Sequence, residues 1–291
     1  MLALLPQLLL TGLTVGSTYA LIALGFVLIY NVTGILNFAQ GEFAMLGALL
    51  CAAVLAWHIP LALAALIAVA AVCALGAATE RLAIEPAYGS HPLTLIIITF
   101  GVSMAFRGLA LMFWGADPYA LPEFTPGPVL VLLGGVVVRQ ALWAIGLSVV
   151  VVGALFFFFA HTVPGAAVRA CADNPFASRL VGISPRRMSL LAFTLSAGLG
   201  AAAGIVITPI TGATYDMGLA LGLKGFVAAV IGGLTNAPAA VVGGYLVGVI
   251  EALTTGYLAP GYSSAITFLV LLAVLFFQRE GLLHTTRRRQ A

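Results

Sequence analysis

The feature that most constrains this chain is its succession of long apolar runs, most of them about 18–22 residues in length. A helix needs about 20 such residues to cross the roughly 30 Å of hydrocarbon in a bilayer. Buried strands of a parallel sheet are also apolar throughout, but they are far shorter. Hydrophobic residues make up 62% of the sequence and charged residues 7%, whereas about 25% of residues in soluble domains are charged. The sequence therefore predicts an all-α, polytopic membrane protein.

The apolar runs predict eight or nine transmembrane helices, some of them broken or re-entrant. The expected spans are 8–30, 41–57, 60–79, 93–114, 141–160, 189–207, 239–258 and 262–277. A further apolar segment, 224–234, is too short to cross unaided. The first run lacks a basic flank and a small-residue cleavage site, so we expect it to be retained as a span. Loops are expected at 80–92 and 115–139, and the Gly/Thr-rich connection 208–223 could dip back into the membrane.

The positive charges set the expected orientation in the membrane. Nine of the twelve basic residues fall in segments that alternation of the spans places on one side. These nine are Arg81, Arg169, Arg179, Arg186, Arg187, Arg279, Arg287, Arg288 and Arg289. Because basic residues concentrate in cytoplasmic loops, we expect that side and the C-terminus to be cytoplasmic. The N-terminus lies outside if 31–40 reaches the cytoplasmic face and inside if that stretch is re-entrant, and both options stay open. The net charge of +3 follows this pattern and does not indicate nucleic-acid binding.

Four ionisable side chains fall within the expected spans, where a charge is costly and often functional. They are Glu42, Arg107, Lys224 and Glu251. One interpretation is structural: Glu42 and Arg107 form a buried pair or other contacts between helices, and Glu251 contacts the backbone or Lys224. The other is that some of them line a hydrophilic path.

Two stretches interrupt the runs at membrane depth, NFAQGEF (37–43) and GGLTNAPAA (232–240). Irregular backbone at that depth must be buried in protein or face a water-filled cavity. Half-helix ends there would offer partial charges to a zwitterionic or anionic solute, and buried kinks without a ligand are the alternative. We therefore expect Asn37, Glu42, Lys224, Asn236 and Glu251 to lie near a translocation path.

The one long polar interruption, PGAAVRACADNPFASRLVGISP (164–185), contains a short helix with clear boundaries. Asn174 can cap it, Pro175 suits its first position and Gly182 supplies the stop. Its apolar stripe consists of Phe176, Ala177, Leu180 and Val181. Two turns of helix are not stable alone in water, so the membrane surface or a soluble partner must cover the stripe. An interfacial loop is the plainer interpretation, and the rest of the chain favours a docking element.

Common catalytic and metal-binding motifs are absent from the sequence. It contains no GxxxxGK[ST], HExxH, CxxC or GxSxG pattern. The four histidines are scattered at span ends, and the three cysteines form no framework. We therefore expect no enzymatic activity and no cofactor in this chain.

Three blocks of sequence, in order, resemble the LivH-type permease subunits of branched-chain amino acid ABC importers, and the resemblance runs nearly end to end. The first block comprises Gly16, Tyr19, Ala20, Leu21, Ala23, Leu24, Gly25, Gly34, Asn37, Phe38, Ala39, Gly41, Glu42, Met45, Gly47 and Ala48. The second comprises Gly165, Arg169, Ala170, Asn174, Ala177, Leu180, Gly182 and Ile183. The third comprises Gly222, Leu223, Lys224, Phe226, Ala228, Ala229, Gly232, Gly233, Gly243, Gly244, Gly248 and Glu251.

The chain departs from the family pattern at three positions. Gln40 stands where the family usually has histidine, which removes a titratable group beside the expected path. Thr235 and Ala239 replace common glycines in the second break, which stiffens it.

The resemblance implies a single permease domain, 1–291, of a multi-pass protein in the bacterial inner membrane. Its cytoplasmic coupling loop, 164–187, would dock into a groove of an ATPase subunit. The residues implied in coupling are Arg169, Asn174, Phe176, Ala177, Arg179, Leu180, Val181 and Gly182. Other implied partners are a LivM-like second permease, membrane lipids and a periplasmic solute-binding protein docked on 115–139 and 208–223. The two ATPase subunits, similar to LivG and LivF, would bind ATP and Mg.

The implied function is uptake of branched-chain amino acids, or of a related small carboxylate or amide, coupled to ATP hydrolysis by those separate subunits. A stand-alone secondary transporter of a small polar solute is the alternative. Uptake by this chain alone, driven by an ion gradient, would distinguish it.

Overall fold

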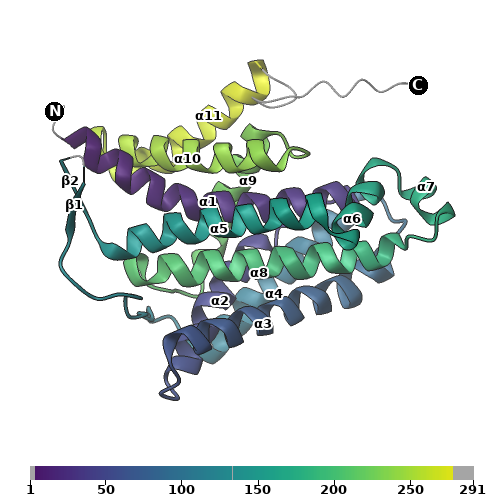
Figure 1. Ribbon diagram of the computed structural model, residues 1–291, viewed down its shortest axis with the longest axis horizontal. Helices are drawn as coiled ribbons and strands as arrows, with labels where there is room; N and C mark the ends of the chain where they lie inside the picture. Colours follow the sequence, from purple (N-terminus) through teal and green to yellow (C-terminus); the bar gives the residue numbers. More distant parts are fainter. Residues whose placement is uncertain (1–3, 133, 278–291) are drawn as a thin grey trace.

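The computed structural model describes residues 4–132 and 134–277 as a bundle of helices with a small hairpin at one end (Figure 1). The α-helices are α1 (Leu5–Thr33), α2 (Gln40–Leu55), α3 (Leu61–Thr79), α4 (Pro92–Trp114), α5 (Arg139–His161), α6 (Val163–Asp173), α7 (Pro175–Leu180), α8 (Pro185–Thr211), α9 (Met217–Gly232), α10 (Ala237–Tyr257) and α11 (Ser263–Phe277). The shorter elements are η2 (Glu80–Ile84), η3 (Glu85–Ala87), η4 (Pro260–Tyr262), β1 (Leu130–Leu132) and β2 (Gly135–Val137). Four predicted cytoplasmic arginines, Arg279, Arg287, Arg288 and Arg289, lie outside the described residues.

Six of the described helices are long and apolar enough to cross a membrane, and three shorter apolar helices accompany them. The six are α1, α3 with its extension to Ala87, α4, α5, α8 and α10, and the shorter ones are α2, α9 and α11 with η4. Large apolar side chains such as Ile97, Met104 and Met112 point outward from α4, away from the other helices of this chain. The predicted all-α, polytopic membrane fold is confirmed.

Two connecting segments differ from the sequence-based expectation. The start of the predicted 80–92 loop stays helical, through the five residues of η2 and the three of η3. The predicted connection 208–223 is split, because α8 continues to Thr211 and α9 already begins at Met217. Gly218 and Gly222, which suggested a loop, lie in α9 where it passes close to α2. A Cβ added at Gly218 would overlap Glu42, and one at Gly222 would lie 3.1 Å from the Cα of Gly41.

α1 and α8 run through the centre of the bundle, and α1 packs directly on α10. A Cβ added to Gly12 of α1 would lie 2.7 Å from the Cα of Val249 on α10. Gly248 of α10 meets the backbone of Gly16 in the same way. Small residues therefore bring the two backbones together, which is how helices commonly associate inside membranes.

The two ends of the bundle are distinct (Figure 1). At one end the β1–β2 hairpin pairs with the start of α1, where Gln7 Oε1 accepts a hydrogen bond of 2.6 Å from the Val136 amide. At the other end lie α6 and α7, and the last turns of α1 pack there against α6 and α8. The break after α1 therefore reaches the α7 end, so α1 begins at the end opposite α7.

Candidate functional site

The break between α1 and α2 ends deep inside the bundle and is held there by hydrogen bonds. Gly34, with φ of 70°, ends α1, and Asn37 Oδ1 accepts a bond of 3.1 Å from the Ala39 amide. Gln40 is fully buried: its Nε2 donates to the Ser196 carbonyl at 3.0 Å, and its Oε1 accepts from the Ser196 hydroxyl at 2.6 Å. Protein groups on α8 thus hold the start of α2, as irregular backbone at membrane depth requires.

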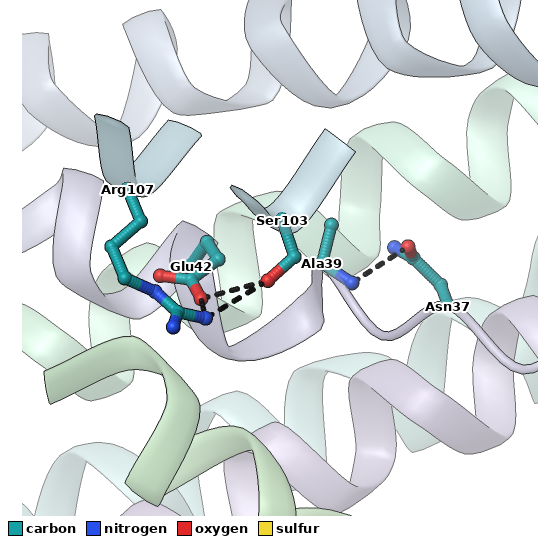
Figure 2. Close-up of polar contacts among 5 residues, drawn as sticks. All are labelled: Asn37, Ala39, Glu42, Ser103 and Arg107. Atoms are coloured by element: carbon teal, nitrogen blue, oxygen red, sulfur yellow. Dashed lines mark hydrogen bonds and ion pairs between the residues drawn. The ribbon is translucent and has the colours of Figure 1, made fainter. Parts of the chain in front are cut away.

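Glu42, in the first turn of α2, forms an ion pair with α4 (Figure 2). Its Oε1 accepts bonds from Arg107 Nη2 and from the Ser103 hydroxyl, each at 2.9 Å. Arg107 Nη2 also contacts Ser103 Oγ at 3.3 Å, because the two residues are one turn apart on α4. Ser103 lies eleven residues from the start of α4, about 16 Å along it and near the middle of a 30 Å membrane. The Glu42 side chain is 1% exposed and that of Arg107 is 25% exposed, so the pair is open only from the arginine side.

The first turn of α9 covers the other side of the Glu42 carboxylate. Glu42 Oε2 lies directly against Gly218, where an added Cβ would overlap it. Asp216, just before α9, is exposed and close enough to Glu42 for electrostatic interaction. The start of α2 thus lies between α4, which supplies a cation, and the α9 terminus, which adds a second carboxylate.

Aromatic rings cluster on the α7 side of this pair. Phe38, in the break before α2, lies 5.1 Å from the Phe100 ring of α4 and 5.8 Å from the Phe226 ring of α9, between centroids. Phe38 and Phe226 are partly exposed, and Phe100 is 43% exposed. An accessible apolar surface therefore lies next to the buried charges and is built from the same three elements.

A second ion pair joins α9 to α10. Lys224 Nζ contacts Glu251 Oε1, and Glu251 Oε2 accepts a hydrogen bond of 2.6 Å from the Tyr19 hydroxyl of α1. Lys224 also lies over the Tyr19 ring, 5.6 Å from its centroid. Each charge has an opposite charge within reach, so this group also ties three helices together.

The five predicted path residues fall in three places rather than one. Asn37 and Glu42 lie at the start of α2, and Lys224 and Glu251 form the second pair. Asn236 lies at the turn between α9 and α10, where its Oδ1 caps α10 by accepting a bond of 3.2 Å from the Ala239 amide.

The sequence indicates both ion pairs, but it does not indicate the neighbouring residues that bond to them or pack against them. Arg107 was recognised as an intramembrane charge but was not placed on the path. Ser103 gives no signal in the sequence, because hydroxyl groups are common in membrane helices. Tyr19 belongs to the first block that resembles the family, but nothing in the sequence pairs it with Glu251. The sequence predicts a loop around Gly218, and only the approach of α9 to α2 shows the contact of this glycine with Glu42.

The segment after α5 forms two helices at the end of the bundle. Asn174 caps α7: its Oδ1 accepts bonds of 3.0 Å from the amides of Phe176 and Ala177. Gly182, with φ of 83°, follows α7 as the predicted stop. The side chains of Phe176 and Leu180 are 71% and 76% exposed. The predicted short, capped helix is present, and its apolar face lies open.

Comparison with known proteins identifies the family. A family model described as branched-chain amino acid transport system, permease component, matches residues 8–275. The chain belongs to this family. It is similar to the high-affinity branched-chain amino acid transport system permease protein LivH of Salmonella typhimurium, with 33% identity over 94% of this chain and 93% of the relative. It is also similar to the permease protein BraD of Pseudomonas aeruginosa, with 33% identity over 95% of each chain.

Among solved structures, the fold is similar to that of PsaBC from Streptococcus pneumoniae in complex with Fab. The TM-score is 0.50 with 11% sequence identity, over 94% of this chain and 91% of the other, so this likeness concerns the fold alone. Family membership and the six spanning helices make the chain a multi-pass membrane permease component. The resemblance to LivH-type permeases is therefore confirmed. Gln40, the departure from the usual family histidine, is buried against α8, so the change affects the core of the bundle.

Proposed function

We propose that this chain is the transmembrane subunit of an ABC importer that carries branched-chain amino acids, or a related small carboxylate or amide, across the inner membrane. One observation carries the proposal: the chain aligns over nearly its full length with LivH and BraD, which are named as permeases of branched-chain amino acid transport. The match covers a whole subunit rather than a shared module. In this proposal the chain catalyses no reaction, and ATP and Mg bind to separate ATPase subunits.

α7 is the proposed contact with an ATPase. The exposed apolar residues Phe176, Leu180 and Val181 need a cover, and the Asn174 cap and Gly182 stop hold them on a defined helix. Arg169, Ala177 and Arg179 are exposed around this face. Because α7 is followed within a few residues by the buried helix α8, movement of α7 would be passed to the core of the bundle.

The orientation follows from the arginines of the described residues. Arg81, Arg169, Arg179, Arg186 and Arg187 belong to the segments at the α7 end, where Arg186 pairs with Glu85 at 3.4 Å. This end is therefore the proposed cytoplasmic face, with the C-terminus on the same side. The opposite end, with the hairpin within 115–139 and the connection between α8 and α9, is the proposed docking face for the solute-binding protein.

The assembly would contain a LivM-like second permease and two ATPases similar to LivG and LivF. Of the predicted path residues, Asn37 and Glu42 would lie at the middle of the path and Asn236 near its cytoplasmic end. Lys224 and Glu251, partly exposed, would line a neighbouring part of it.

Reconstitution tests the proposal. The chain is produced with the second permease, ATPases and binding protein encoded beside it, and radiolabelled leucine uptake into liposomes is measured. We expect uptake that needs both ATP and the binding protein. Uptake by this chain alone under a proton or sodium gradient would instead establish a secondary transporter.

A further inference from the structure

The Glu42–Arg107 pair contains buried polar atoms without a hydrogen-bond partner. Five buried side-chain atoms of the described residues make no hydrogen bond: Glu42 Oε2, Arg107 Nε, Asn37 Nδ2, Ser189 Oγ and Ser263 Oγ. Two of the five belong to this ion pair, and Asn37 lies in the break just before α2. The Glu42 and Asn37 side chains are at most 1% exposed. Buried polar atoms are almost always hydrogen-bonded, so two such atoms within one ion pair, Glu42 Oε2 and Arg107 Nε, indicate that the pair can bind a further polar group. One is a carboxylate oxygen and the other is an N–H donor, which suits a ligand that carries both an ammonium and a carboxylate group.

The exposure of Arg107 indicates where such a ligand would enter. Its side chain is 25% exposed about two thirds of the way along α4, well inside the membrane. An arginine exposed to lipid at that depth is strongly disfavoured. This face of α4 must therefore be turned toward water or toward another protein, not toward lipid.

The distances suit an amino acid with a short apolar side chain. The Arg107 guanidinium reaches back to Ser103, and Phe100 lies three residues before Ser103, about 4.5 Å along the helix. The rings of Phe38 and Phe226 lie beside Phe100. When the carboxylate of the ligand lies at the Arg107 guanidinium, the branched aliphatic side chain of the ligand therefore lies next to the three aromatic rings.

We propose that Arg107, Ser103 and Glu42 recognise the zwitterionic head of the transported amino acid. The carboxylate binds the Arg107 guanidinium and the Ser103 hydroxyl, and the ammonium group binds Glu42 Oε2. The aliphatic side chain packs on Phe38, Phe100 and Phe226. This inference rests on the proposed function, since it names the contacts by which that importer holds its substrate.

The charges in the site balance when the ligand binds. Glu42 and Arg107 neutralise each other, and a bound zwitterion would exchange this single pair for two new ones without adding net charge. Gly218 presently lies on Glu42 Oε2, so the ammonium group gains access only when the first turn of α9 moves away from α2. In the structure described, the first turn of α9 therefore covers the proposed ammonium-binding side of Glu42.

The test separates recognition from a purely structural ion pair. The complete importer, with its ATPases and binding protein, is reconstituted with the double substitution Glu42→Gln and Arg107→Gln. Glutamine matches the size of glutamate and, although shorter than arginine, leaves a neutral hydrogen-bonding side chain at both positions. Replacing both members of a buried ion pair avoids the uncompensated buried charge that removal of one partner would leave. Leucine uptake and ATP hydrolysis stimulated by the binding protein are both measured. Arg81→Gln, at an exposed position at the α7 end, is the matched control.

We expect the double variant to retain stimulated ATP hydrolysis while leucine uptake per ATP falls on the order of tenfold to a hundredfold. Normal uptake per ATP in the double variant would overturn the inference, because the pair would then be structural. Should the double variant fail to assemble, Ser103→Ala decides, since it leaves both charges in place: a several-fold fall in uptake per ATP supports the inference and an unchanged value overturns it. If the unmodified complex takes up neither a branched-chain amino acid nor a related small carboxylate or amide, the proposed function itself is contradicted.

Discussion

Replacing Leu180 with glutamate places a carboxylate in the middle of the exposed apolar face of α7. The leucine is 76% exposed, so about three quarters of its surface is available to an ATPase. Full burial of a leucine is worth about 1.5–3 kcal/mol, which gives about 2 kcal/mol for this contact. A carboxylate left unpaired in the interface adds about 1 kcal/mol or more. The expected loss of about 3 kcal/mol corresponds to roughly a hundredfold weaker binding.

The fold itself should tolerate this change. Substitutions at exposed positions usually alter the free energy of unfolding by about 0.5 kcal/mol or less. The amount of Leu180→Glu protein in the membrane should therefore match the unmodified chain, while the ATPase no longer co-purifies with it and uptake is abolished. Val163→Glu is the matched control, because Val163 is 85% exposed but begins α6 and lies outside α7. Normal co-purification of the ATPase with Leu180→Glu would refute the docking role of α7.

Three further predictions concern packing and buried charges. Gly248→Leu forces a side chain into the backbone of α1 and should prevent accumulation of the detergent-extracted protein, whereas Gly101→Ala, where nothing lies within 4 Å, should accumulate normally. Gln40→Leu removes both hydrogen bonds to α8 and should lower the free energy of unfolding by about 1–3 kcal/mol, seen as a lower unfolding temperature of the purified complex. An unchanged unfolding temperature would contradict the role of Gln40 in holding α2 against α8. Lys224→Met leaves the charge of Glu251 without its cation and should destabilise the complex by about 3–5 kcal/mol, seen in the same unfolding assay. Adding Glu251→Gln to this variant should recover most of the lost stability.

The spans were predictable because the membrane imposes a minimum helix length. The ends of α4 and α5 agree with the sequence within two residues, since apolar runs there give way abruptly to polar or helix-breaking residues. The cap and stop of α7 were also predictable, because Asn174 and Gly182 act on neighbouring backbone atoms. The β1–β2 hairpin was missed, although the adjacent Gly134 and Gly135 within an apolar, valine-rich stretch are a recognised turn signal.

The candidate site was only partly predictable, because its geometry depends on residues far apart in the sequence. Glu42 and Arg107 could be suspected as partners from the scarcity of charges in the membrane, and their bond confirms that interpretation. The contribution of Gly218 could not be foreseen, because local propensity assigns glycine to loops and only the packing of α9 on α2 reveals it. Asn236 is predicted to lie near the path because it belongs to a break, and its Oδ1 caps α10; its role in the path stays a prediction.

α8 has a mechanical consequence that follows from its length. Its 27 residues form a rod about 40 Å long that starts close to α7, and Ser196 lies about 16 Å along it. If the rod pivots at its α7 end, a tilt of about 5° displaces Ser196 by about 1.4 Å and the far tip by about 3.5 Å. A displacement of this size would lengthen the 2.6 Å hydrogen bond between Ser196 and Gln40 beyond bonding distance, unless α2 moves together with α8. A small rotation of α8 at one face of the membrane would therefore also move α2, the helix that carries Glu42.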